Sequence, residues 1–345
     1  MIKEEIYDER KKKVKKKTEE KNPRLGKVGG QALLEGIMMR SGDDIAISVR
    51  AMDGTVRSKK TKFVSLRKKY KFLGIPFIRG MVSFVESLVM SYKTMDEGVD
   101  MLGIEEEETK FEKWLKKKFG ANLMDVLMPL AMVLGVFLAL GIFVFLPTLI
   151  AGWIAIPFGN DIGIWKSVIE GVLKVGIFVA YMLLVSLVPD IKRTFEYHGA
   201  EHKSIFCYEN GEELTVENVK KYSRFHPRCG TSFMFVMILI GIIIGFILPT
   251  DMNTILRGVC KVLLLPVTMG LGFEFLMYAG KHDNWLIRAL SAPGLWMQRI
   301  TTKEPSGDQI EVAIKSLKLA MPDEFPNEEM LAPDPKPETA ETAEA

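Results

Sequence analysis

The sequence is dominated by long runs of apolar residues separated by strongly charged stretches. Four such runs approach or exceed the roughly 20 residues that cross a bilayer core of about 30 Å as a helix; they lie at about 124–148, 168–188, 232–249 and 258–280. Backbone polar groups cannot be left unpaired in hydrocarbon, so spanning segments of this kind fold as helices. The pattern predicts an α-helical multi-pass membrane protein with four spans and argues against two soluble domains.

Lysine and arginine are concentrated in one connecting loop. The segment 190–231 carries seven of them, whereas 149–167 and 250–257 carry one each. Because positive residues are retained on the cytoplasmic side, we expect a cell-membrane protein with this loop and both termini in the cytoplasm. Three cysteines are too few for a disulfide framework, and a net charge of +3 gives no indication of nucleic-acid binding.

Residues 26–71 have the pattern of a small β-containing module. Apolar side chains at Ile45, Ile47 and Val49 alternate with polar ones, as on a strand with one buried face. The Asp53-Gly54 pair that follows is a strong hairpin signal, because both residues tolerate positive φ. Since the segment precedes the first span, we place the module in the cytoplasm.

Two regions are apolar without having the features of spans. Residues 72–92 contain Arg79 and Glu86, and a charge at mid-bilayer costs at least a few kcal/mol. We therefore expect an interfacial helix, followed by a charged linker up to residue 123. Residues 281–321 combine tryptophan, arginine and helical apolar spacing, which indicates interfacial or amphipathic helices.

Both ends of the chain have compositions that disfavour folding. Residues 1–25 hold a lysine run with few apolar side chains, and residues 322–345 are rich in Pro, Glu, Ala and Thr. Such segments cannot bury enough apolar surface to offset chain entropy. We expect a disordered basic arm and a disordered acidic tail.

Three of the four histidines lie in the predicted cytoplasmic loop. His198 and His202, with Glu201 between them, have the form H-x-x-E-H, which on a helix places both imidazoles on one face. The rings can hold one metal ion, with Glu201 as the general base toward an activated water, as in the inverzincin peptidases. His226 and Cys229 follow at a turn before the third span.

A catalytic zinc site takes three protein ligands and leaves a position for water. His226 is our first choice for the third ligand, with Cys229 and Glu274 as alternatives. Glu274 is included because a carboxylate inside a span is a functional candidate by default. We therefore predict a site for Zn²⁺ or another divalent metal at the cytoplasmic face.

The same residues permit a structural interpretation. The two histidines of the motif can cap and pack a juxtamembrane helix, and His226, which precedes a proline, can be a turn residue. Cys207 and Cys229 can be small packing groups, and Glu274 can hydrogen-bond to a neighbouring span. Only the joint pattern indicates a site.

Three segments resemble the YqhQ-like bacterial membrane proteins, a family of unknown function labelled as predicted metal-dependent enzymes. They are GGQALLEGIMMR at 29–40, YHGAEHKSIFCYENGEELTVENV at 197–219 and HPRCGTSF at 226–233. The resemblance covers about residues 26–320 and implies a multi-pass bacterial membrane protein. It leaves substrate and reaction open, and the family's label rests on the same histidine and cysteine pattern.

Two functions fit this pattern. The first is a metal-dependent hydrolase acting on a lipid-linked or membrane-protein substrate at the cytoplasmic surface. The alternative is a non-catalytic scaffold or regulator with a closed structural metal site completed by Cys229, with Cys207 as a further candidate ligand. A transporter is less favoured because no repeat architecture is visible, and a homo-oligomer is compatible with each. We also expect segment 29–40 to pack beside the loop site.

Overall fold

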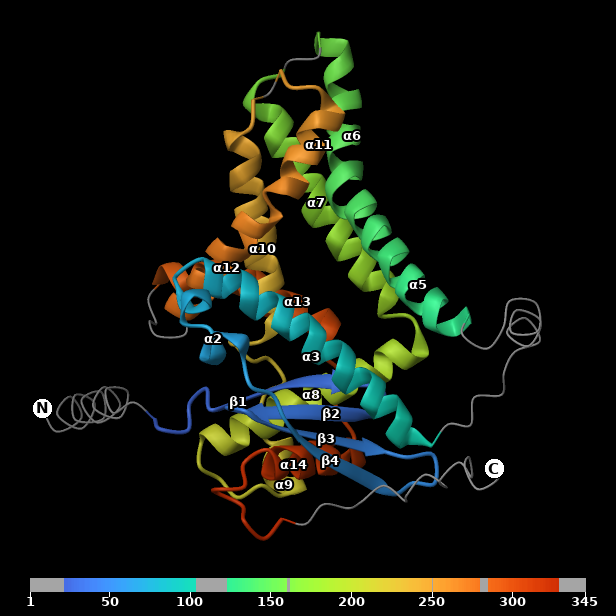
Figure 1. Cartoon of the computed structure of the whole chain (residues 1–345), viewed down its shortest axis with the longest axis vertical. Helices are drawn as coiled ribbons and strands as arrows, with labels where there is room; N and C mark the ends of the chain where they lie inside the picture. Colours follow the sequence, from blue (N-terminus) through green and yellow to red (C-terminus); the bar gives the residue numbers. More distant parts are fainter. Residues whose placement is uncertain (1–21, 104–122, 160–161, 250, 280–284, 329–345) are drawn as a thin grey trace, which may run out of the picture.

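The structure, a computed structural model, describes residues 22–103, 123–159, 162–249, 251–279 and 285–328. It is mostly helical, with one small antiparallel sheet near the N-terminus (Figure 1). A tall bundle of apolar helices stands at one end, and the sheet with its covering helices lies at the other. The parts of the predicted arm, linker and tail at 1–21, 104–122 and 329–345 lie outside the described residues.

The sheet has the strand order β1-β2-β3-β4, and each strand pairs with the next along the chain. The strands are β1 (Val28–Leu33), β2 (Gly36–Ser41), β3 (Asp44–Arg50) and β4 (Val56–Lys62). Glu35 (φ 50°) and Gly42 (φ 63°) supply the positive φ of the first two tight turns. Asp53 and Gly54 lie between β3 and β4, so the predicted hairpin is confirmed.

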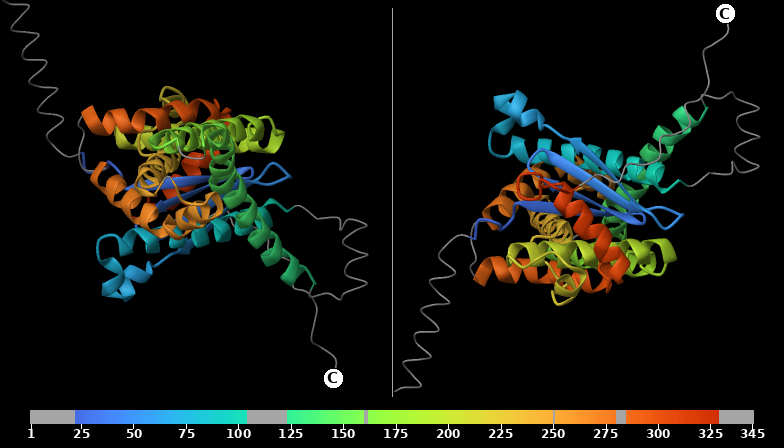
Figure 2. Two further views of the ribbon diagram at one scale, coloured as in Figure 1. Left: turned by 90° about the horizontal axis from the view of Figure 1, so that it is seen from above. Right: turned by 90° about the horizontal axis from the view of Figure 1, so that it is seen from below.

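Both faces of the sheet are covered. Ile45, Ile47 and Val49 of β3 form one buried cluster with the end of α3 (Ile78–Leu102). On the opposite face, residues of β2 and β3 pack against α8 (Pro189–Glu209) and α14 (Gly307–Leu319). Figures 1 and 2 show the sheet between these helices. This double burial explains why β2 and β3 carry apolar residues at consecutive positions.

The bundle contains the apolar helices together with several short connecting turns. Its members are α5 (Leu123–Leu140), the π-helical turn η2 (Gly141–Phe145), α6 (Leu146–Ala155), η3 (Ile156–Phe158), α7 (Ile164–Val185), α10 (Gly230–Ile247), α11 (Thr254–Leu263), α12 (Leu265–Ala279) and α13 (Trp285–Thr301). The remaining short helices are α2 (Leu66–Lys69), η1 (Lys71–Gly74) and α9 (Val216–Lys220).

Among the described residues, two helical stretches are long and apolar enough to cross a membrane, Leu130–Phe158 and Ile164–Val185. A third candidate is the pair Thr254–Leu263 and Leu265–Tyr278, which is bent by 48°. Pro266 stands at the start of α12, where its ring is tolerated but cannot continue α11. Met234–Ile247 is apolar but shorter. The described residues therefore contain two or three candidate spans, where the sequence pattern predicted four.

Helix α3 joins the sheet to the bundle. It begins at Ile78 and continues to Leu102, ten residues beyond the predicted end of the interfacial helix. The two charges that argued against a span are both paired, because Arg79 binds Glu274 of α12 and Glu86 accepts hydrogen bonds from the Ser65 hydroxyl. A Cβ on Gly80 would meet Phe273 at 2.8 Å, so α3 and α12 are in close contact.

Helix α14 is the main cover of the outer sheet face. A capping box of Ser306 and Gln309 fixes its start. Its apolar positions Ile310, Ala313 and Leu317 are fully buried. The predicted amphipathic spacing is thus confirmed, although the apolar face of α14 packs on the sheet and α8 rather than facing outward.

Replacing Ile310 by alanine should lower the free energy of unfolding by about 2–5 kcal/mol, because it opens a cavity in a fully buried core. The matched control is Glu311→Ala on the exposed face of the same helix, whose ion pair with Arg50 is largely solvated and should change stability by less than about 1 kcal/mol. Thermal or denaturant unfolding of the purified variants measures both, and equal losses would contradict this packing.

Candidate metal centre

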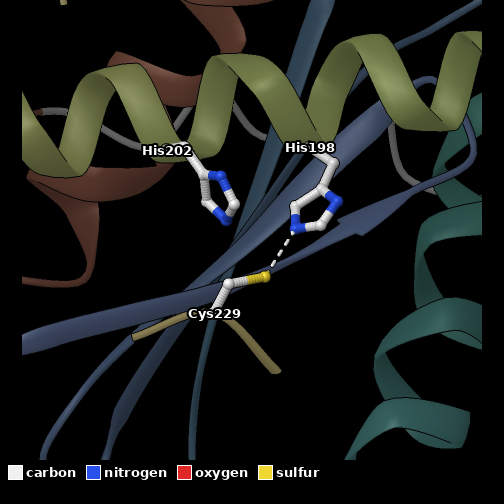
Figure 3. Close-up of side chains that lie close together, drawn as sticks. All are labelled: His198, His202 and Cys229. Atoms are coloured by element: carbon white, nitrogen blue, oxygen red, sulfur yellow. Dashed lines mark hydrogen bonds between the residues drawn. The ribbon is translucent and has the colours of Figure 1, made fainter. Parts of the chain in front are cut away.

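Helix α8 presents the H-x-x-E-H motif toward the interior of the protein. It starts with Pro189 in its first turn, where proline needs no hydrogen-bond partner, and crosses one face of the sheet. The rings of His198 and His202 lie one turn apart with centroids 4.4 Å from each other. Figure 3 shows both imidazoles directed toward Cys229. The predicted single face for the two histidines is confirmed.

Each imidazole is oriented by a backbone carbonyl. Nδ1 of His198 lies 2.8 Å from the Thr301 oxygen, and Nδ1 of His202 lies 2.5 Å from the Arg224 oxygen. A carbonyl only accepts, so each Nδ1 carries a proton, and in the neutral form of each ring the lone pair is on Nε2. Burial also lowers the pKa of His202, which keeps that ring neutral. Bonds of this kind to the distal ring nitrogen are typical of metal-ligating histidines.

Cys229 completes a cluster of three donor atoms. It ends the turn before α10 and is buried, with its sulfur 3.2 Å from Nε2 of His198. The ligand atoms of His198, His202 and Cys229 all lie within 4.8 Å of one another. Two neutral imidazoles and one thiol are a donor set that suits Zn²⁺. The residues therefore fit a divalent metal, and Cys229, rather than His226, is the third donor of this cluster.

Glu201 lies beside the cluster and is buried. Burial raises its pKa to about 7; Cys229 adds to this shift, while His198 and the Gly30 N–H oppose it. One of its carboxylate oxygens, Oε2, has no hydrogen-bond partner among the described residues. A buried carboxyl that titrates near neutrality is suited to exchange protons with a substrate or with water.

Two glycines allow the backbone to approach α8 closely. A Cβ on Gly30 of β1 would lie 2.9 Å from Cδ of Glu201, and a Cβ on Gly199 would lie 2.0 Å from the Lys303 oxygen. The first contact explains the glycine at position 30, and it confirms that segment 29–40 packs beside the site. The second brings the end of α13 to α8, which places the Thr301 carbonyl on His198.

His226 lies next to the cluster but faces another partner. Its Nε2 is 3.5 Å from a carboxylate oxygen of Glu209, which Arg228 also binds. Burial opposes ionisation of Glu209, but His226, the Gly26 N–H and Arg228 outweigh it and lower its pKa. The backbone of His226 is held by Gln298 of α13 at 2.7 and 2.8 Å. His226 thus fixes the turn that carries Cys229.

The remaining sequence candidates lie elsewhere. Glu274 forms a bidentate pair with Arg79 and accepts the Phe77 N–H, so it serves the contact between α12 and α3. Cys207 points toward the Glu213 carbonyl, and burial raises its pKa to about 11, so it stays a neutral thiol. The fourth histidine, His282, lies outside the described residues.

Sequence reasoning did not identify the groups that orient the ligands. The carbonyls of Thr301 and Arg224 are backbone atoms, which every residue type supplies, so the sequence does not indicate them. Gln298 carried no local motif, and Gly199 was passed over inside the H-x-x-E-H segment. The signal available for Gly199 was a helix-interior glycine, which costs about 1 kcal/mol relative to alanine and calls for a packing reason.

Comparison with known proteins places the chain in a family. Residues 75–323 match the family described as Protein of unknown function (DUF1385). The chain is also similar to the protein named "Uncharacterized protein YqhQ" of Bacillus subtilis (strain 168), with 34% identity over 294 residues, 84% of this chain and 90% of that protein. No solved structure matches. The chain belongs to the DUF1385 family, and the resemblance to YqhQ-like proteins is confirmed.

Replacing Gly30 by alanine should disturb the site, because the new methyl group would meet Glu201, Met39 and the Met38 carbonyl at 2.8–2.9 Å. We expect a loss of about 1–3 kcal/mol in stability, typical of an overpacked core. Gly29→Ala is the matched control, since a Cβ there meets nothing within 4 Å. Thermal unfolding of both variants checks this, and an equally stable Gly30→Ala protein would contradict the contact.

The raised pKa of Glu201 predicts a pH dependence of the metal-free protein. The folded state holds this proton more tightly than the unfolded chain, so stability falls as pH rises from about 4.5 to about 7. Glu201→Gln removes the ionisable group. The variant should therefore be more stable than its parent at pH 8, and the difference should shrink toward pH 5. Melting temperatures of chelator-treated protein measure it, and a pH-independent difference would refute the assignment.

Proposed function

We propose that this DUF1385 protein is a membrane-embedded, metal-dependent hydrolase. His198, His202 and Cys229 hold a divalent cation, Zn²⁺ by preference, and Glu201 is the general base. The observation that carries the proposal is the convergence of two carbonyl-anchored imidazoles and one thiol beside a buried carboxyl with an unpartnered oxygen. No single member of this group is specific, but their joint geometry is that of a metal centre.

The number of donors favours a catalytic over a structural centre. Structural zinc sites have four protein ligands, whereas catalytic ones have three and keep a position open. Within the described part of the chain, the donor cluster has three members, and Cys207, the further ligand considered for a structural site, points to a carbonyl instead. The fourth position is then left for water or substrate, next to Glu201.

The protein groups have distinct tasks in this proposal. When bound, the cation would supply Lewis-acid activation of water and of the scissile carbonyl or phosphoryl group. The Thr301 and Arg224 carbonyls keep the two imidazoles in the tautomer with Nε2 unprotonated. Glu201 takes the proton from the attacking water and returns it to the leaving group, a role open to a buried carboxyl whose Oε2 has no partner among the described residues.

The surroundings support a substrate at the membrane surface. In Figure 1, α8 crosses behind the sheet, below the bundle, and α3 runs from the bundle down toward the sheet. Helix α3 exposes an apolar stripe, with Val85, Leu88 and Tyr92 each at least half exposed. We infer that this stripe rests in the membrane interface. A lipid-linked or membrane-protein substrate then reaches the site from the bilayer side.

We retain the topology with four spans, a cytoplasmic loop 190–231 and cytoplasmic termini as part of this proposal. The loop forms α8, α9 and the turn to α10, so the metal centre and the sheet share one side of the bundle. The excess of lysine and arginine in loop 190–231 supports a cytoplasmic location for this loop, and with it a location of the protein in the cell membrane. The short helix Met234–Ile247 and the bent pair around Leu264 would be the third and fourth spans.

A structural metal site in a non-catalytic scaffold or regulator is the second candidate. It is favoured by burial, because His202 and Cys229 are only 2% and 8% exposed. A cation there would tie α8 to the turn before α10 and, through Thr301, to α13. In that case Glu201 would be dispensable for function, whereas the hydrolase requires it.

Metal content of variants tests the proposal. Purified protein should contain about one equivalent of metal, and His198→Ala or Cys229→Ser should lose most of it. Cys207→Ser is the matched control and should keep its metal, because Cys207 lies outside the cluster. Elemental analysis of the purified proteins gives these values, and metal that persists in Cys229→Ser would exclude this ligand set.

Glu201→Gln separates the two functions. Under the hydrolase proposal it keeps bound metal and loses about 10²–10⁴-fold in turnover, the usual effect of removing a general base. Deletion of the gene and complementation with each variant provides a cellular readout where a substrate is lacking. Full complementation by Glu201→Gln would favour the structural site.

A further inference from the structure

A second group of buried charged residues lies inside the bundle, at the end away from the sheet. Glu170 of α7 and Arg257 and Lys261 of α11 are at most 9% exposed, and Lys174 follows Glu170 by one turn. Figure 1 shows α7 and α11 side by side in the upper bundle, and Lys261 and Glu170 are in contact. Charges inside apolar spans are costly, so such a group calls for a functional explanation.

Arg257 makes the most hydrogen bonds in this group. Its guanidinium donates to Glu170 at 3.1 Å, to the Ser167 hydroxyl at 2.8 Å and to the carbonyls of Leu248 and Pro249. All of its nitrogens are used within the protein. Glu170 and Arg257 therefore form a hydrogen-bonded ion pair that joins α7 to α11.

The two lysines share the single carboxylate of Glu170 with Arg257. Nζ of Lys261 binds Glu170 at 2.5 Å and Thr148 at 2.9 Å, but that carboxylate already serves Arg257. Lys174 interacts with Glu170 electrostatically, and its ammonium makes no hydrogen bond to the part of the chain that the structure describes. One carboxylate thus faces three cations, which leaves an excess of positive charge in an apolar surrounding.

Both lysines line a cavity of about 420 Å³ between η2, α7, α10 and α12. This volume is within the range of about 300–1,000 Å³ typical of ligand pockets. Apart from the two lysines, Tyr181 and Thr268, its walls are apolar and are formed by side chains such as Phe143, Phe178 and Met234. Lys174 and Lys261 also border a smaller space of about 10 Å³ beside Glu170 and Ser167, enough for about one water.

We propose that this cavity binds an anionic membrane lipid, with the head-group phosphate at Lys174 and Lys261 and an acyl chain along the apolar wall. The phosphate supplies the negative charge that the two ammonium groups lack, and the chain fills a space that water would occupy unfavourably. A neutral lipid would make only the apolar contacts with the cavity wall, and free phosphate would pair only with the two lysines. The inference assumes that α7 lies in a bilayer but does not depend on the metal centre, which lies beside the sheet.

Native mass spectrometry of the full chain in detergent tests this with three probes: phosphatidylglycerol, phosphatidylcholine and inorganic phosphate. Phosphatidylglycerol should bind with one-to-one stoichiometry and better than phosphatidylcholine. Lys174→Met should weaken phosphatidylglycerol binding about tenfold, as expected for the loss of one charge-assisted hydrogen bond, while Lys174→Arg should retain it. The exposed Lys192→Met is the matched control and should bind as the parent does.

Ile238→Trp provides a second test that leaves the charges unchanged. It fills the cavity from α10, so phosphatidylglycerol binding should fall although both lysines remain. Equal binding of the two lipids, or parental binding by both Lys174→Met and Ile238→Trp, would overturn the proposal. Displacement of phosphatidylglycerol by millimolar inorganic phosphate would also overturn it, because the site would then recognise an ion and not an amphiphile.

Discussion

The close approach of α8 to its neighbours is the constraint on which the candidate site depends. Gly30 lets strand β1 contact Glu201, and Gly199 lets the end of α13 contact α8 on the adjacent side. Because these approaches are close, the Thr301 carbonyl reaches His198, and Glu201 is excluded from water. The donor geometry and the raised pKa of the carboxyl therefore have a common origin in backbone packing, not in the motif alone.

The same packing connects the two ends of the molecule. Helix α8 packs on the sheet, and its residue His202 hydrogen-bonds to the Arg224 carbonyl. Cys229, which lies near His198, directly precedes α10 of the bundle. Gln298 of α13 fixes the turn at His226, while α3 reaches from the sheet to α12 through Arg79 and Glu274. A cation at this junction would therefore couple the sheet to the helices of the bundle, whichever of the two proposed functions is right.

Much of this could be predicted from local patterns. The alternation in β3, the Asp53-Gly54 turn and the spacing in α14 are local signals, and so is the shared helix face of His198 and His202. The choice between His226 and Cys229 could not be predicted, because it depends on the path of a turn held by Gln298, 72 residues away from His226. The charges of Glu170, Lys174, Arg257 and Lys261 were visible in apolar segments, but their pairing across α7 and α11 required the fold.

The central claim is that His198, His202 and Cys229 bind one metal ion and leave one position open. X-ray absorption of the purified, metal-containing protein measures the first coordination shell most directly. The account predicts one sulfur and three nitrogen or oxygen neighbours, two of them imidazoles, with the sulfur lost in Cys229→Ser. A shell without sulfur, a shell with two sulfurs, or protein that contains no stoichiometric metal would contradict it.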